Sequence, residues 1–228
     1  NCLSWNMFWD FGSGQVGDMG SHTMDLVWNA IDPTLPTTAE GVAHKPGKSK
    51  DSEDGEPIPP HADCAPVELH TSFDLPAIDW RPAMKVHWYQ GGMMPRTPRE
   101  WVDLRRIGHG AMFKGSEGFL VCDFGQRLLI PHGDRANMTY YKPRTKETVM
   151  PPLGNFQTQW VKACKGDLKT ACDFDYSGKM IETMLLGVAA YRAGKKLEYD
   201  PETGRVKNDE AANALLSRKY REGWTLNG

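Results

Sequence analysis

The sequence lacks a surplus of charge of either sign. Its 228 residues include 27 Lys and Arg against 29 Asp and Glu, a net charge of −2 at pH 7. Proteins that bind a phosphate backbone usually carry a strong basic surplus, so we expect no nucleic-acid partner. The chain also lacks any apolar run near the roughly 18 residues that a membrane-spanning helix requires. We therefore expect no membrane partner.

Paired cysteines are missing as well. The five cysteines are an odd number, and no two of them form a CxxC pair. This pattern predicts neither a disulfide framework nor a zinc cage. His61-x-x-Cys64 and the other histidines do not have the spacing of metal ligands, so we expect no metal site.

The first residues, NCLSWNMFWDFGSG, lack the basic start and apolar stretch of a signal peptide. The chain begins with Asn, and we interpret it as starting in mid-protein. Any targeting signal would then lie outside this sequence, so the compartment stays open.

Hydrophobic periodicity predicts an α+β fold. Helical spacing favours helices over residues 17–31, 156–164 and 180–188, and a further helix capped by Asn208. Alternation favours strands over residues 67–73 and 84–89 and an antiparallel meander over residues 111–130. We expect one domain over residues 1–228, an open and largely antiparallel sheet with helices on one face, and a flexible surface loop at about 44–66.

The segment Gly12-Ser-Gly-Gln-Val-Gly17 has the spelling of a dinucleotide-binding loop. That motif also needs a strand before it and an acidic residue at the end of a second strand about 20 positions later. Asp32 has that offset but closes the helix over residues 17–31, and no second strand has occurred. Asp18 also places a negative charge where a pyrophosphate would sit. We interpret the glycines as a tightly packed loop.

Asp18-x-x-x-His22 is the sharpest local signal. Asp18, His22, Asp25 and Asn29 fall within about 60° of one another on one side of the expected helix. A carboxylate four residues before an imidazole can orient the ring, an arrangement that suits a general acid or base. An ordinary surface Asp–His pair has the same spacing, and the residues alone leave both interpretations open.

Aromatic residues offer candidate sugar contacts. Most of the eight Trp residues are expected in the core. Trp5, Trp9 and Trp88 lie near glycine-rich turns and could stack on the apolar face of a sugar ring.

Several segments resemble the bacterial branch of the Gfo/Idh/MocA oxidoreductases, and they span nearly the whole chain apart from residues 44–66. The resemblance is carried by FGSGQVGDMGSHTMDLVW (11–28), KVHWYQGGMMP (85–95), GAMFKGSEGFLVCDFG (110–125), FQTQWVKACKG (156–166), CDFDYSGKMIETMLLGVAAYRAGKKLEYD (172–200) and YREGW (220–224). The first of these is similar to the opening of the family's C-terminal domain, which binds substrate and forms oligomer contacts.

The resemblance implies an NAD(P)-dependent enzyme that transfers hydride to or from a sugar, inositol or similar polyol. His22 would exchange the hydroxyl proton, and Asp18 would orient its ring. Together with the stacking argument for Trp9 and Trp88, we expect Trp9, Asp25 and Trp88 to contact substrate. It also implies a homo-oligomer formed through the sheet. Relatives include exported enzymes with twin-arginine signals, so cytoplasm and periplasm both remain open.

One departure from the family is large. The family's catalytic lysine lies in a Glu-Lys-Pro motif of a Rossmann domain, and neither occurs here. NAD or NADP would therefore be held by another part of the full-length parent, and we expect this chain alone to bind none. Two alternatives stay open: a domain of an NAD-dependent glycosidase that uses transient oxidation and elimination, and a non-catalytic interaction domain.

Overall fold

The computed structural model describes residues 5–43, 61–133 and 154–224. Most of the expected surface loop at 44–66 therefore lies outside the described residues. The elements, in chain order, are η1 (Trp5–Met7), α1 (Gly14–Ile31), β1 (Thr38–Val42), β2 (Leu69–Leu75), β3 (Met84–Gln90), η2 (Leu104–Arg106), β4 (Ala111–Lys114), β5 (Gly118–Cys122), β6 (Arg127–Pro131), α2 (Phe156–Lys165), α3 (Phe174–Ala193), β7 (Leu197–Asp200), β8 (Arg205–Val206) and α4 (Glu210–Asn213).

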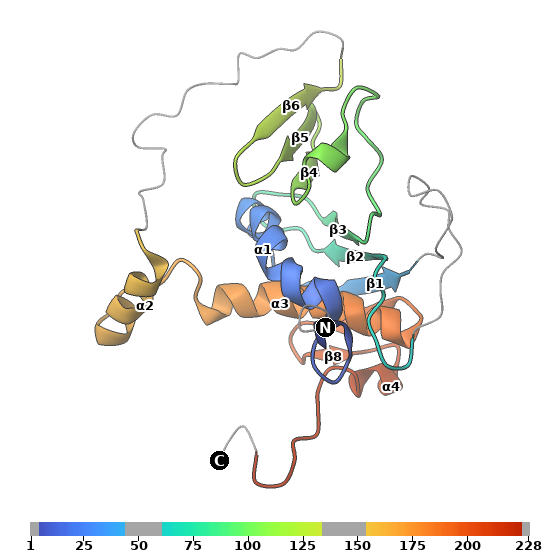
Figure 1. Cartoon of the computed structure of the whole chain (residues 1–228), viewed down its shortest axis with the longest axis vertical. Coiled ribbons are helices and arrows are strands. Elements are labelled where there is room, and N and C mark those ends of the chain that lie inside the picture. Colours follow the sequence, from blue (N-terminus) through green and yellow to red (C-terminus); the bar gives the residue numbers. More distant parts are fainter. Residues whose placement is uncertain (1–4, 44–60, 134–153, 225–228) are drawn as a thin grey trace.

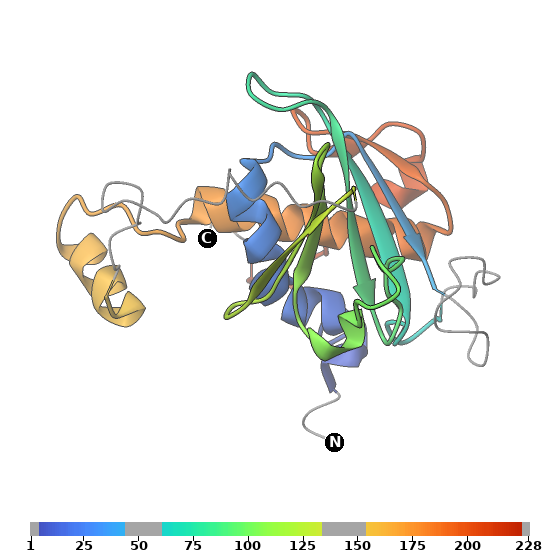
Figure 2. The ribbon, with the colours of Figure 1, turned by 90° about the horizontal axis from the view of Figure 1, so that it is seen from above.

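The fold is α+β, as the sequence predicted. The described strands form two antiparallel sheets, one of five strands in the order β3-β2-β1-β7-β8 and one of three in the order β4-β5-β6. The smaller sheet lies beside α1 and β3 (Figures 1 and 2). We expected a single sheet. The meander is separate because β4, β5 and β6 pair only with one another and bury their own small cluster around Val121 and Ile130.

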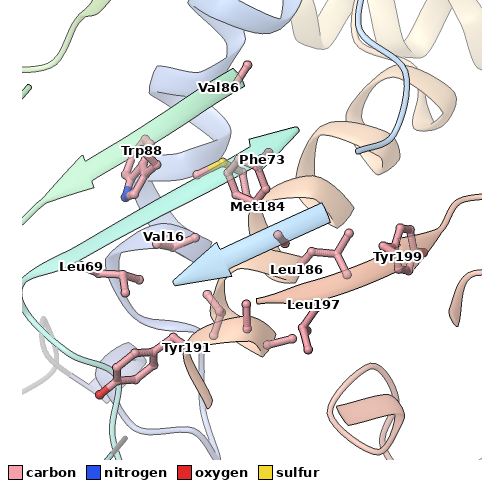
Figure 3. Packing of buried hydrophobic residues seen from close by; sticks show 14 of the residues in the cluster. Val16, Leu69, Phe73, Val86, Trp88, Met184, Leu186, Tyr191, Leu197 and Tyr199 are labelled. Carbon is pink, nitrogen blue, oxygen red and sulfur yellow. The ribbon is translucent and has the colours of Figure 1, made fainter. Parts of the chain in front are cut away.

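The main core lies between the five-stranded sheet and helix α3 (Figure 3). Alternate residues of β2, among them Leu69 and Phe73, point into this core. Close approach of helix and sheet depends on two glycines, because a Cβ on Gly41 would lie 2.4 Å from the Gly187 carbonyl oxygen. Dense packing of this kind fixes the position of α3 relative to the strands.

Helix α1 packs on α3, and a hydrogen bond holds its C-terminal end. A Cβ on Gly20 would lie 3.1 Å from Met184 Cε, and Trp28 is buried. At the C-terminal end, the buried Arg81 donates from Nε to the Ile31 carbonyl oxygen at 2.7 Å. A cation that satisfies an end carbonyl stabilises a helix terminus. The helix ends before Asp32-Pro33, as predicted.

Two helices differ from the sequence-based expectation. The N-cap of α4 is Asp209, so the prediction of Asn208 is wrong, and the helix ends at Asn213. The Asn208 side chain instead binds the backbone of Lys196 and Glu198 beside β7. Helix α2 forms as predicted, but none of its residues is buried and it projects from the body (Figure 1). Over the described part of the chain, no helix has both the length and the hydropathy for a bilayer span.

Candidate functional site

The polar face of α1 carries the predicted proton-handling residues. Asp18 and His22 are exposed on this helix and Asp25 is half-buried. The opposite side of the helix packs on α3 through Gly20 and Met24. The spacing along the helix places the His22 imidazole between the Asp18 and Asp25 carboxylates, each about one turn away. The packing of the buried side holds the helix that carries them.

The Asp18 carboxylate does not bind the His22 ring. Asp18 Oδ2 accepts a hydrogen bond from Asn6 Nδ2 at 3.1 Å, which ties η1 to α1. Within the described ranges, no hydrogen bond or ion pair joins Asp18 to His22. The His22 side chain is exposed, and its orientation by Asp18 stays a prediction.

The third residue of the face, Asp25, is bound from a different helix. Tyr176 of α3 donates from its hydroxyl to Asp25 Oδ1 at 2.5 Å. Burial, together with the bond to this carboxylate, raises the pKa of Tyr176 well above its ordinary value. Tyr176 thus stays protonated and acts as a donor over the physiological pH range.

Sequence reasoning missed Tyr176 because it began the helix at Met180. The signal was Asp173, whose carboxylate accepts from the Tyr176 backbone N–H as the N-cap of α3. With the helix extended to that cap, Tyr176 precedes Met180 and Met184 by four and eight residues and shares the face that packs on α1.

The two predicted tryptophans lie in different places. Trp88 is 7% exposed in the main core (Figure 3). Its Nε1 donates to Oε1 of the buried Gln90 at 2.9 Å. Its ring therefore has little surface to offer a sugar. Trp9 is equally buried, donates from Nε1 to the His61 carbonyl oxygen, and carries the Arg192 guanidinium 4.8 Å above its ring.

A cleft of about 570 Å³ opens beside Trp9. Arg192 and Arg218 line it together with Asp10 and Asp63, and Arg218 donates to the Trp9 carbonyl oxygen. The lining does not include Asp18, His22 or Asp25. The structure thus brings the three α1 residues together and leaves Trp9 and Trp88 outside their group.

The glycine-rich segment before α1 does not fit a dinucleotide. It follows the short helix η1 and not a strand. A Cβ on Gly12 would lie 2.5 Å from the Asn6 carbonyl oxygen, and one on Gly14 would lie 2.5 Å from Ala65 Cβ. The glycines therefore allow the protein to pack against itself, as the interpretation of a tightly packed loop required.

Comparisons with known proteins add no assignment. The chain matches no protein-family model and no curated protein. Among the described residues, no group of three His, Cys, Asp or Glu side chains is placed to hold a metal ion. The α1 face offers an imidazole that can exchange a proton and carboxylates that can accept hydrogen bonds from hydroxyl groups.

Proposed function

We propose that this chain is the substrate-binding domain of an NAD(P)-dependent oxidoreductase that acts on a sugar, inositol or similar polyol. The observation that carries the proposal is the exposed His22 between Asp18 and Asp25 on the polar face of α1, a helix whose opposite side is packed on α3. The resemblance of the surrounding segments to Gfo/Idh/MocA enzymes supports the same function.

In this proposal His22 acts as the general base and acid for the proton of the reacting hydroxyl group. Its neutral imidazole accepts that proton during oxidation and returns it during reduction, a role worth about 10²–10⁴-fold in rate. The nearby carboxylates of Asp18 and Asp25 offset the positive charge that the ring acquires. A carboxylate of this pair also accepts hydrogen bonds from neighbouring substrate hydroxyls.

The hydride acceptor, NAD or NADP, has to be held elsewhere. The space beside Gly12 and Gly14 is filled by protein atoms, so the glycine-rich segment at Gly12–Gly17 does not provide a dinucleotide cradle. The proposal therefore requires a separate cofactor-binding domain that faces α1.

Substitution of His22 tests the proposal in the complete gene product. We expect His22→Ala to lower kcat by about 10²–10⁴-fold for glucose, xylose or myo-inositol with NAD or NADP. The measurement is nicotinamide absorbance, and His109→Ala, which removes another exposed histidine, is the matched control. Turnover within about twofold of the wild type in folded His22→Ala would contradict an acid–base role.

One observation favours a second candidate, a non-catalytic interaction domain. Asp18 binds Asn6 and not His22, as expected if this helix face is an ordinary solvated surface. Unchanged turnover in His22→Ala supports this alternative. Product analysis separates the glycosidase alternative, because that enzyme releases a sugar without net formation of NADH.

A further inference from the structure

The bond between Tyr176 and Asp25 joins two helices at the edge of the proposed site. The residues are 151 positions apart, and their side chains meet at 2.5 Å where α3 packs against α1. A hydrogen bond to an ionised carboxylate is stronger than one between neutral groups, and it limits how the carboxylate can turn. Tyr176 is therefore placed to control where the Asp25 oxygens point.

Only one of the two Asp25 oxygens is used by this bond. Oδ1 accepts from Tyr176, while Oδ2 has no hydrogen-bond partner among the described residues. An ionised carboxylate can accept several hydrogen bonds, so Oδ2 keeps its capacity for a ligand. His22 lies three residues before Asp25, and side chains at this spacing are neighbours on a helix surface.

We propose that Tyr176 is a positioning residue that fixes Asp25, so that Asp25 Oδ2 accepts a substrate hydroxyl next to the one whose proton His22 exchanges. The inference rests on the proposed function and deepens it, because it assigns the recognition of a second substrate hydroxyl to Asp25. Asp25 contacts the substrate, whereas Tyr176 acts only through Asp25.

The positional part is tested by NMR on this chain, without turnover. In Tyr176→Phe we expect the Asp25 carboxyl carbon and the His22 ring resonances to shift relative to the wild type. The matched control is Tyr199→Phe, because Tyr199 makes an equivalent 2.5 Å bond to Glu182 at another part of α3. Unmoved Asp25 and His22 resonances in folded Tyr176→Phe, or equal shifts in the control, would overturn the proposal.

The substrate part is tested by kinetics of the complete gene product with myo-inositol. We expect Tyr176→Phe to raise KM by about tenfold and to leave kcat within about twofold, the pattern of lost binding. Asp25→Ala should raise KM at least as much, and adding Tyr176→Phe to it should change KM no further. Additive effects, or an unchanged KM in Tyr176→Phe, would contradict the proposal.

The two tests also separate this inference from the proposed function. The function fails when His22→Ala leaves turnover unchanged, whatever the spectra show. The inference fails when the Asp25 and His22 resonances are unchanged in Tyr176→Phe, even if His22→Ala abolishes turnover.

Discussion

At the scale of single residues, Asp74 shows how one carboxylate joins several strands. On the outer face of the sheet, Asp74 Oδ1 lies 2.7 Å from Lys85 Nζ. Its Oδ2 accepts from Thr38 at 2.6 Å and from Lys196 at 2.9 Å. These donors, with Lys85 the strongest, hold the pKa of Asp74 well below its ordinary value. The carboxylate thus links β1, β2 and β3 with the residue before β7.

Asp74→Asn should weaken the fold in a pH-dependent way. The pKa of Asp74 is lowered by folding, so its contribution is complete above the unfolded pKa of about 4 and disappears as pH falls through the lower folded value. The side chain is 34% exposed, and water therefore reduces the effect. We expect a loss of about 1 kcal/mol in the free energy of unfolding at pH 7.

Urea unfolding at several pH values measures this difference. The gap between wild type and Asp74→Asn should shrink below about pH 4. Asp79→Asn is the control, because Asp79 is exposed and has no bond to another described side chain. A gap that stays constant down to the acid range would contradict an electrostatic origin.

At the scale of elements, the contact between α3 and the sheet depends on the absence of a side chain. A Cβ on Gly187 would lie 2.8 Å from Thr71 Cβ and 2.9 Å from Phe73 Cζ. Both neighbours are fully buried in β2 and have no room to move. Helix and sheet would have to separate to accept even one methyl group.

We therefore expect Gly187→Ala to lower the free energy of unfolding by about 1–3 kcal/mol, the usual cost of overpacking a core. Gly178→Ala in the same helix is the matched control, because its Cβ would meet nothing within 4 Å. That change should stabilise the protein by about 0.5–1 kcal/mol, since Ala has the higher helix propensity. Urea unfolding compares the variants, and a Gly187→Ala protein as stable as the wild type would contradict the packing argument.

The same contact explains which elements the sequence could predict. Strands β2 and β3 alternate large apolar residues with polar ones, and both were predicted close to their observed bounds. Strand β1 was missed because its inward residues are Ala39 and Gly41, which are small where α3 comes close. Strand β7 was also missed, although its four residues Leu197–Asp200 alternate apolar and polar side chains, because a run this short is a weak signal.

The sequence could likewise predict only part of the candidate site. The spacing of Asp18, His22 and Asp25 is a local property of one helix, and their shared face could be predicted from the sequence. The bond from Tyr176 to Asp25 depends on how α1 packs against α3. No local spacing encodes that contact, so it needed the three-dimensional structure.

At the scale of the whole molecule, the two faces of the five-stranded sheet differ. The inner face packs on α3, whereas the outer face carries polar and aromatic side chains from β1, β2 and β3. The His70 ring stacks on Tyr89 with ring centres 4.4 Å apart and lies 2.9 Å from His87 through ring nitrogens. Tyrosine is enriched at protein interfaces, and the resemblance described above implies a homo-oligomer through the sheet, so we expect association through this face.

Tyr89→Glu should dissociate such an oligomer. In an isologous interface the same patch is used by both copies, so the substitution would place an unpaired carboxylate on both sides of the interface. Light scattering after size-exclusion chromatography measures the mass, and Trp101→Glu, at an exposed aromatic residue outside the strands, is the control. We expect Tyr89→Glu to be monomeric and Trp101→Glu to keep the mass of the wild type. An unchanged oligomer in this variant, or a monomeric wild type, would contradict association through the outer face of the sheet.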